Sequence, residues 1–432
     1  MSETVLIRGG RVIDPRNKVS GVRDLFLRDG RVAEVSERPI PTDRATKVID
    51  AAGRWVTPGF IDLHAHLREP GQEGKETILS GSLAAVAGGF TAVVAMPNTR
   101  PVNDSPLVTQ FVLGRAREAN LCRVYPAGAV SKGQEGAELA EIGELVAAGC
   151  VCVTDDGRPV MNAGLMRRAL QYARPFGIPV MVHAEDLNLS GKGAMNEGPR
   201  ATRWGLPALP ASAEVAMVAR DLVLLEETKG RLHVAHVSCE GAVRLVCEAK
   251  RRGLAVTAEA TPHHFTLTDA AVEGYDTHAK MSPPLRAQRD VDAVRAGLAD
   301  GTLDAIATDH APNGILDKAC EFDKAANGII GLETALPLAL ELVAAGLLNP
   351  ERMVELFTHG PAAAFGLPGG HLAVGAPADV TILDPAASYR IDAERFFSKS
   401  RNTPFDGRAV KGRVSHTLVG GRLVFEAAAA AS

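Results

Sequence analysis

The sequence has little of what a membrane protein, a secreted scaffold or a nucleic-acid binder needs. No apolar run reaches the roughly 18 residues of a membrane-spanning helix, and Met1 to Gly9 lacks the pattern of a signal peptide. The six cysteines show no paired spacing of a metal knuckle, and Cys150 and Cys152 alternate along a strand-like run where we expect them to be buried. The net charge of −4 gives no reason to expect nucleic acid as a partner. We therefore expect a cytoplasmic globular protein with no membrane or nucleic-acid partner.

The two ends of the chain share a strand-rich texture around glycine turns. Asp29-Gly30 is a strong hairpin signal after one such strand. At 432 residues the chain suits one large domain and one smaller domain. We predict a small β-sandwich formed by residues 1–55 and 369–432 around a central domain of residues 56–368.

The central segment alternates short apolar runs with longer helix-like stretches. Eight such strand-then-helix units predict an α/β fold, a closed (β/α)8 TIM-like barrel. The eight runs are Val56–His66, Thr91–Met96, Arg123–Ala127, Cys150–Thr154, Pro179–His183, Leu232–His236, Ala255–Ala260 and Leu303–Thr308.

Chemically active side chains follow these runs at their carboxyl ends, the face of such a barrel that carries active sites. His64 and His66 close the first run, and side chains at i and i+2 of a strand point to the same side. Two neutral imidazoles in the same space suit a zinc-like ion. His-X-His alone is a weak signal, but the turn and strand of Thr57–Asp62 before it favour a ligand pair.

Two further histidines end apolar runs. His183 and His236 would each lie at the barrel mouth, although a single histidine at a strand end is more often a core or surface group. His233 lies three residues before His236, faces the other way and is interpreted as structural. The sequence therefore leaves His183 and His236 as candidate ligands.

Two acids complete the set. Asp155-Asp156-Gly157 is by default a turn, and Asp309 has the alternative role of a helix cap. A carboxylate after an apolar run is costly unless it is paired with a cation, so a metal ligand is the better interpretation beside the histidines. Four histidines and two aspartates exceed what one tetrahedral ion needs. They suit two metals that activate a water for hydrolysis.

Arg68 is again two residues beyond a candidate ligand and is expected to point into the same pocket. Its guanidinium can hold a substrate carboxylate through two hydrogen bonds. Asn98 follows the second run and can add a further hydrogen bond to the same anion. The alternatives are a surface salt bridge for Arg68 and a turn for Asn98.

Taken together, these segments resemble the bacterial class I dihydroorotases of the amidohydrolase superfamily. Family members interconvert N-carbamoyl-L-aspartate and L-dihydroorotate in pyrimidine biosynthesis, on a barrel with a β-sandwich. The resemblance therefore implies a zinc-dependent cyclic amidohydrolase with this small-molecule substrate. It spans nearly the whole chain and rests on Asp62–Gly71, Met96–Thr99, Thr261–His264, Thr308–Pro312 and Gly331–Pro337.

The resemblance also implies roles for individual side chains. Asp309 would be the general base, and Arg68 and Asn98 would hold the substrate carboxylate. Two zinc ions per subunit are implied, one held by His64, His66 and Asp309, the other by His183 and His236, with Asp156 bridging them.

Two expected substrate contacts depart from the family pattern. Asn313 stands where the family usually has a histidine after Asp-His-Ala-Pro, and Ser282 stands where it has an asparagine before Pro-Pro-Leu-Arg. Asn313 can donate a neutral hydrogen bond but carries no charge. That loss is expected to cost roughly 1–2 kcal/mol of substrate binding.

Two alternatives remain beside the dihydroorotase activity. Some family members are inactive structural partners of aspartate transcarbamoylase, but those would be expected to lose metal ligands, and all six are present here. Hydantoinases and allantoinases usually bridge their metals with a carbamylated lysine near the end of the fourth strand, whereas no lysine occurs between Lys132 and Lys192. We also expect a homodimer, with aspartate transcarbamoylase as a further candidate partner.

Overall fold

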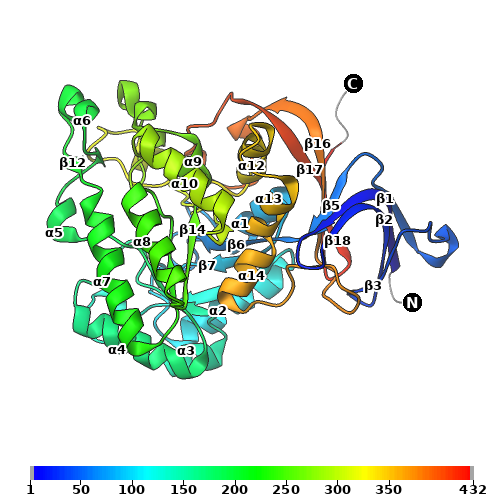
Figure 1. The fold of residues 1–432 in the computed structure, drawn as a ribbon, viewed down its shortest axis with the longest axis horizontal. Helices are drawn as coiled ribbons and strands as arrows, with labels where there is room; N and C mark the ends of the chain where they lie inside the picture. The colour runs from blue at the N-terminus through cyan, green and yellow to red at the C-terminus, as the bar shows by residue number, and fades with distance from the viewer. Residues whose placement is uncertain (1–3, 429–432) are drawn as a thin grey trace.

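Eight parallel strands form a barrel in the computed structural model, which describes residues 4–428 (Figure 1). Neighbouring strands pair in chain order, and a parallel bridge between Ala65 and His310 joins the first strand to the segment after the eighth. The predicted parallel barrel is therefore confirmed. Its strands are β6 (Phe60–Ala65), β7 (Phe90–Ala95), β8 (Arg123–Gly128), β9 (Cys152–Val153), β10 (Val180–Val182), β13 (Leu232–Val234), β14 (Val256–Ala260) and β15 (Ala305–Ile306).

Gly59 divides the first of the predicted runs between two sheets. Residues 56–66 were expected to form one strand, but β5 (Trp55–Pro58) pairs outside the barrel and only β6 belongs to it. A Cβ atom at Gly59 would lie 2.1 Å from Thr91 Oγ1 of β7, so only glycine lets the chain pass this strand so closely. An apolar run shows burial, but it does not show where the chain changes sheets.

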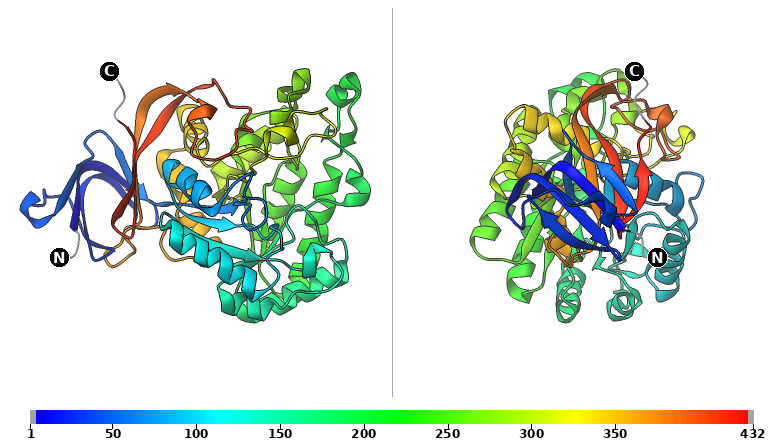
Figure 2. Two further views of the ribbon diagram at one scale, coloured as in Figure 1. Left: turned by 180° about the vertical axis from the view of Figure 1, so that it is seen from behind. Right: turned by 90° about the vertical axis from the view of Figure 1, so that its right-hand side faces the viewer.

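Helices follow the barrel strands and cover the outside of the barrel (Figure 2). The first begins where Thr77 Oγ1 accepts a hydrogen bond from the Ser80 main-chain N–H at 3.1 Å, in a reciprocal cap. Among the described residues, no helix is both long and apolar enough to cross a membrane. The main helices are α1 (Ile78–Ala87), α2 (Pro106–Ala119), α3 (Ile142–Ala148), α4 (Ala163–Ala173), α7 (Ser212–Thr228), α8 (Glu240–Arg251), α10 (Gln288–Asp300), α12 (Ala335–Ala344), α13 (Pro350–Phe357) and α14 (His359–Phe365).

Short helices and strands lie within the loops that follow the barrel strands, around the mouth of the barrel. They are α5 (Leu187–Ser190), β11 (Met195–Asn196), α6 (Pro199–Trp204), β12 (Ala208–Leu209), α9 (Pro262–Thr266) and α11 (Ile315–Lys318). The two short strands β11 and β12 pair with each other in a sheet of their own.

Both chain ends contribute to a second, mostly antiparallel sheet beside the barrel. Strand β5 joins its two halves, because it pairs with the N-terminal β1 on one side and the C-terminal β16 on the other. The Asp29-Gly30 hairpin is confirmed, with both residues at positive φ between β2 and β3. The domain limits at residues 55 and 369 stay a prediction. The strands are β1 (Thr4–Asp14), β2 (Val19–Arg28), β3 (Arg31–Ser36), β4 (Lys47–Asp50), β5, β16 (Val380–Arg390), β17 (Ala409–Val419) and β18 (Arg422–Glu426).

Each part has its own apolar core. Apolar side chains from alternate strand positions fill the barrel interior, among them Leu63, Val94, Ala127 and Met181. A larger cluster lies between the strands and the surrounding helices, and a third lies within the terminal sheet. Cys150 and Cys152 are buried as expected, and all six cysteines are free thiols.

Candidate metal centre

The six side chains predicted as ligands meet at the carboxyl end of the barrel. All are buried, and they come from the ends of β6, β9, β10, β13 and β15 or from the residues just after them. Two groups of three stand out, because their ligand atoms all lie within 4.8 Å of one another. The groups are His64, His66 and Asp309, and His64, Asp156 and His236.

The first group has the spacing of a tetrahedral site. Ligand atoms about 2.0–2.1 Å from one ion lie about 3.3 Å from each other in that geometry. Asp309 Oδ1 lies 3.0 Å from His66 Nε2 and 3.4 Å from His64 Nε2. These separations match a shared cation without rearrangement of the backbone.

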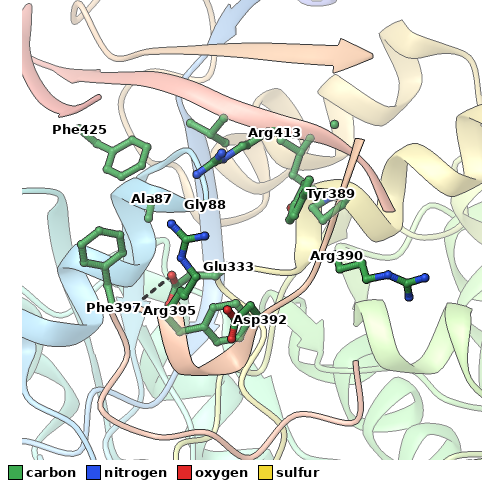
Figure 3. A pocket seen from close by; sticks show the side chains of 15 residues that line it. Ala87, Gly88, Glu333, Tyr389, Arg390, Asp392, Arg395, Phe397, Arg413 and Phe425 are labelled. Atoms are coloured by element: carbon green, nitrogen blue, oxygen red, sulfur yellow. Dashed lines mark hydrogen bonds between the residues drawn. The ribbon is translucent and has the colours of Figure 1, made fainter. Parts of the chain in front are cut away.

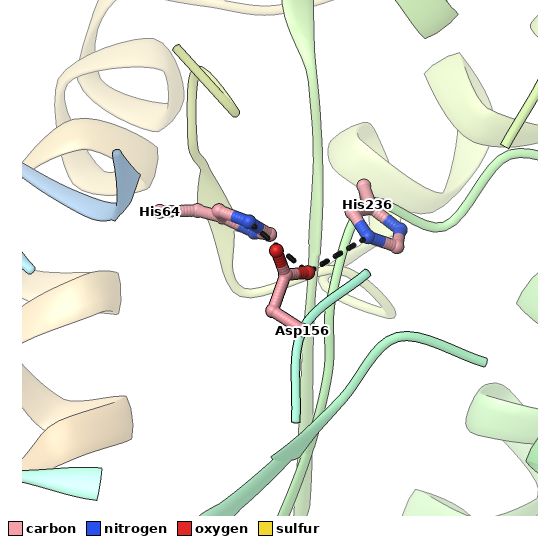
Figure 4. Close-up of side chains that lie close together, drawn as sticks. All are labelled: His64, Asp156 and His236. Carbon is pink, nitrogen blue, oxygen red and sulfur yellow. Dashed lines mark ion pairs between the residues drawn. The ribbon is translucent and has the colours of Figure 1, made fainter. Parts of the chain in front are cut away.

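Asp156 faces the histidines on both sides of the site (Figure 4). Its Oδ1 lies 3.4 Å from His64 Nε2 and 3.7 Å from His236 Nε2. His183 falls outside the two compact groups, but its Nδ1 is 2.9 Å from His236 Nε2 and 3.7 Å from Asp156 Oδ1. The acid therefore lies between a pair of histidines from β6 and a pair from β10 and β13.

The donor atoms fit a divalent transition metal. Imidazole nitrogen and carboxylate oxygen are its usual protein ligands. The buried Nε2 of His64 has no hydrogen-bond partner among residues 4–428. The Nδ1 atoms of His64 and His66 instead face Glu259 Oε1 at 3.2 Å and Asn98 Oδ1 at 2.9 Å. Protons on these Nδ1 atoms leave both Nε2 atoms free to bind a cation.

The electrostatics of the site also favour a cation. Burial alone would lower the pKa of His64, but the charges of Asp309 and Asp156 raise it well above its usual value. Burial opposes the charge of Asp156 too, yet the His64 charge and hydrogen bonds from His183 and His236 hold the pKa of that carboxyl well below its usual range. Two ionised carboxylates among buried imidazoles therefore stabilise positive charge here.

Two acids behind the histidines were not predicted from the sequence. Glu259 is fully buried in β14, and it contacts both His64 and His233. Glu185 Oε2 lies 3.1 Å from His183 Nε2. Glu185 lies two residues beyond His183, so the i, i+2 rule that led to Arg68 could have found it. The sequence indicated Glu259 more weakly, because the only sign of a role was an acidic residue within an otherwise mostly apolar strand.

A cavity of about 340 Å³ opens beside the ligands. Arg68 and Asn98 line it together with His66, Asp156, His183 and Asp309, as the sequence predicted for a shared pocket. The Arg68 Nε donates to the Pro312 carbonyl at 3.0 Å, which leaves the rest of the guanidinium for a ligand. Asn98 Oδ1 is hydrogen-bonded to His66 Nδ1, so the side-chain amide nitrogen of Asn98 remains free to bind a ligand.

The two positions that depart from the family pattern differ in placement. Ser282 lines the cavity, and its hydroxyl donates to Glu185 Oε2 at 2.9 Å. Asn313 is not among the lining residues. Its side-chain Nδ2 donates to the Asn327 carbonyl at 2.9 Å, which ties its loop to the neighbouring one. The substrate contacts of both residues stay predictions.

Residues 398–402, here called the strap, run from the terminal sheet to the loops of the barrel mouth. The Asn313 main-chain N–H donates to Asn402 Oδ1 at 3.0 Å, and Asn402 Nδ2 donates to the carbonyls of Ala311 and Gly328, each at 2.9 Å. At the other end of the strap, the Ser398 hydroxyl donates to Glu76. No local pattern in the sequence indicated these contacts.

Glu76 links the strap to the metal site. Its Oε2 lies 3.2 Å from Nε2 of His310, the residue after Asp309. The main-chain N–H of Lys399 also donates to Glu76 Oε1 at 3.2 Å. The strap thus contacts the loop after Asp309 through Asn402 and reaches His310 through Glu76.

Comparisons with known proteins identify the family of this chain. A family model described as Dihydro-orotase-like matches residues 53–241, and one described as Amidohydrolase family matches residues 263–425. The chain is 62% identical to the dihydroorotase of Anaeromyxobacter sp. (strain K) over 428 residues, 99% of each chain. It is 55% identical to the dihydroorotase of Syntrophotalea carbinolica, over 98% of this chain and 99% of that one.

Among solved structures, similar folds occur in proteins named as hydantoinases and dihydropyrimidinases. The L-hydantoinase (dihydropyrimidinase) from Arthrobacter aurescens matches with a TM-score of 0.88 at 27% identity, covering 99% of this chain and 96% of that one. The D-hydantoinase (dihydropyrimidinase) from Thermus sp. matches with a TM-score of 0.83 at 27% identity, covering 98% and 97%.

Proposed function

This chain belongs to the dihydroorotase family of amidohydrolases, and from this premise we propose that it reversibly hydrolyses the ring amide of L-dihydroorotate to N-carbamoyl-L-aspartate. The observation that carries the proposal is one cavity that holds both the histidine–aspartate cluster and the half-buried guanidinium of Arg68. The cluster suits hydrolysis, and the guanidinium suits a substrate that carries a carboxylate. The reaction would serve de novo pyrimidine biosynthesis.

We assign the metal ligands as the sequence predicted them, for two zinc ions per subunit. When bound, the metal supplies Lewis acidity that makes a water nucleophilic at neutral pH and polarises the amide carbonyl. Outside the ligands, Glu259, Asn98 and Glu185 orient the rings of three histidines. The residues that would hold the ions are His64, His66, Asp156, His183, His236 and Asp309.

Asp309 is the residue that we assign to proton transfer. It lines the cavity and stays ionised, because the charges of His64 and His66 outweigh the effect of burial and lower its pKa. As the water oxygen bonds to the ring carbonyl carbon, Asp309 takes the water proton. When the carbon–nitrogen bond breaks, Asp309 returns that proton to the leaving ring nitrogen. In the reverse direction the same carboxyl takes the proton from the ureido nitrogen.

Arg68 and Asn98 would position the substrate. The guanidinium of Arg68 is anchored through Nε to Pro312, so its remaining donors are fixed in direction for a substrate carboxylate. Asn98 is oriented by the same hydrogen bond that orients His66. Ser282 reaches the cavity from the opposite loop. The substrate ring would thus lie between the carboxylate site and the metal ligands.

The experiment is a substrate comparison on the purified, zinc-loaded protein. We expect turnover of L-dihydroorotate in both directions, loss of turnover after chelation, and its return on addition of zinc. Hydantoin, which lacks the carboxylate, serves as the matched control. Rapid turnover of hydantoin without turnover of dihydroorotate would overturn the proposal in favour of a hydantoinase, the activity of the similar solved structures.

The other expected properties are tested separately. A zinc-loaded chain that turns over neither substrate but co-purifies with aspartate transcarbamoylase would instead support the structural role. Light scattering tests the homodimer that we further propose. The cytoplasmic location stays a prediction.

A further inference from the structure

A second cavity, of about 180 Å³, lies between the barrel and the terminal sheet (Figure 3). Its floor comes from the end of α1 and the beginning of α12, and its walls come from β16, β17, β18 and residues 395–397. It shares no lining residue with the metal-site cavity. The proposed reaction gives it no role.

Two guanidiniums face this cavity without an acid partner. The side chains of Arg395 and Arg413 point toward each other across the space between Phe397 and Phe425. Within residues 4–428, neither guanidinium forms a hydrogen bond or an ion pair with a side chain or a carbonyl. The Arg413 guanidinium carbon lies 5.9 Å from the centre of the Tyr389 ring. Two convergent cations therefore remain for an anionic ligand.

Two acids also line the cavity, Glu333 and Asp392, and among residues 4–428 neither forms an ion pair with these arginines. Asp392 Oδ1 accepts the Glu394 main-chain N–H at 3.1 Å. Both oxygens of Glu333 accept main-chain N–H groups, from Phe397 and Ser398, each at 3.1 Å. Burial raises the pKa of Glu333 to about 7, so this carboxyl carries only part of a negative charge at neutral pH. The third arginine, Arg390, points away from the cavity and donates to the Gly407 carbonyl at 2.9 Å.

The remaining walls suit a flat ring. Phe397 and Phe425 meet edge to face with ring centres 6.0 Å apart, and Phe397 is 46% exposed. Tyr389 forms the opposite wall. A cavity of about 150 Å³ holds one benzene ring, so the volume here accommodates a single six-membered ring with one small substituent. Aromatic edges and guanidinium faces both favour stacking against such a ring.

We propose that this cavity is a binding site for a small planar ring that carries one carboxylate. The carboxylate lies between Arg395 and Arg413, and the ring lies against Phe397, Phe425 and Tyr389.

Occupation of the site would act on the strap. Phe397 is at once a wall of the cavity and a donor to Glu333, and the next residue, Ser398, begins the strap that holds Glu76 beside His310. A ring that packs on Phe397 orders the segment before the strap. The expected effect is slower hydrogen–deuterium exchange of the amides at 396–398.

The test is titration calorimetry of the full-length, zinc-loaded protein with nicotinate. Nicotinamide has the same ring without the charge and serves as the control ligand. We expect one nicotinate site and at least tenfold weaker binding of nicotinamide. Arg413→Gln should weaken nicotinate binding about tenfold, and the Arg395→Gln, Arg413→Gln double variant about a hundredfold. Arg390→Gln, the matched control on the same rim, should leave the affinity unchanged.

A further variant separates this site from the proposed substrate site. Arg68→Gln should leave nicotinate binding intact, whatever becomes of dihydroorotate turnover. Loss of nicotinate binding in Arg68→Gln, or its persistence in a folded double variant, would overturn the proposal. Binding without slower exchange at 396–398 would do the same, because the ligand would then lie elsewhere.

Discussion

Glu259 lies directly behind His64 inside the barrel, with its Oε1 3.2 Å from His64 Nδ1 and its Oε2 3.1 Å from His233 Nε2. Burial disfavours the charged carboxylate, but hydrogen bonds from His233 and His64 lower the pKa of Glu259 to about 2. An ionised carboxylate only accepts hydrogen bonds, so it fixes the His64 proton on Nδ1 and leaves Nε2 for the metal.

Replacing Glu259 should therefore weaken metal binding. We expect Glu259→Gln to lower zinc affinity about 10–100-fold, because an amide can also donate and no longer fixes the His64 tautomer. Competition with a chelating dye measures this. Glu226→Gln, which alters an exposed salt bridge with Arg252, is the control. Equal zinc affinity in all three proteins would contradict the role of Glu259.

Arg68 should decide between substrates with and without a carboxylate. Arg68→Lys keeps the charge but loses the planar pair of donors, so the KM for dihydroorotate should rise about 10–100-fold. The effect on dihydrouracil, which lacks the carboxylate, should be small. Steady-state kinetics with both substrates measure the difference. Equal losses for both substrates would argue against a carboxylate contact.

Ser282 should act through Glu185 on His183. Ser282→Ala removes one of the hydrogen bonds that orient Glu185, and we expect kcat/KM to fall about 3–10-fold with zinc still bound. Ser282→Thr keeps the hydroxyl and should remain near wild-type activity. Kinetics and zinc content of the two variants together test this. A loss of activity in Ser282→Thr as large as in Ser282→Ala would show that side-chain volume, and not the hydroxyl, matters.

Asn402 should be needed to hold the two loops at the barrel mouth together. Asn402→Ala leaves two buried carbonyls and the Asn313 N–H without their partner, which should cost about 1–3 kcal/mol of unfolding free energy. We also expect kcat to fall, since the segment after Asp309 loses its brace. Urea unfolding and kinetics measure the two effects. Asn188→Ala, on the exposed surface of α5, should change neither.

The pH dependence of stability should depend on Glu333. Burial raises the pKa of Glu333 from its usual 4.5 to about 7, so the folded protein holds this proton more tightly than the unfolded chain. The stabilisation is complete below about pH 4.5 and is lost as the pH rises through 7. Glu333→Gln does not titrate, so its unfolding free energy relative to wild type should rise by about 1–3 kcal/mol between pH 5 and pH 8. A constant difference across this range would contradict the raised pKa.

The sequence predicted the barrel because buried parallel strands appear as apolar runs, and the positions of His64 and Asp309 at the ends of such runs followed from that. It also predicted that Arg68 shares their cavity, since alternation along the chain is a local property. Two-residue strands such as β9 and β15 were recognisable only through their apolar flanks.

Contacts between distant segments were out of reach of the same reasoning. Glu259 is 195 residues from His64, and Asn402 is 89 residues from Asn313. No sequence spacing indicates either pair. Closure of the barrel brings Glu259 to His64, and the path of the strap brings Asn402 to Asn313. Asn313 was expected to contact the substrate because it stands where the family usually has a histidine. The hydrogen bond from its side chain to the Asn327 carbonyl was not predicted, and the substrate contact stays a prediction.

The position of the strap late in the chain also determines when the barrel mouth can be completed during translation. Asn402 leaves the ribosome 89 residues after the Asn313 loop that it braces. At about 5–20 residues per second, that is a delay of roughly 4–18 s. During this interval the nascent chain already carries every proposed metal ligand but not the brace for the loop beside them. A chain released between these two points would thus carry all its proposed ligands but lack the brace of its mouth, so the loop beside the ligands depends on a segment that is made much later.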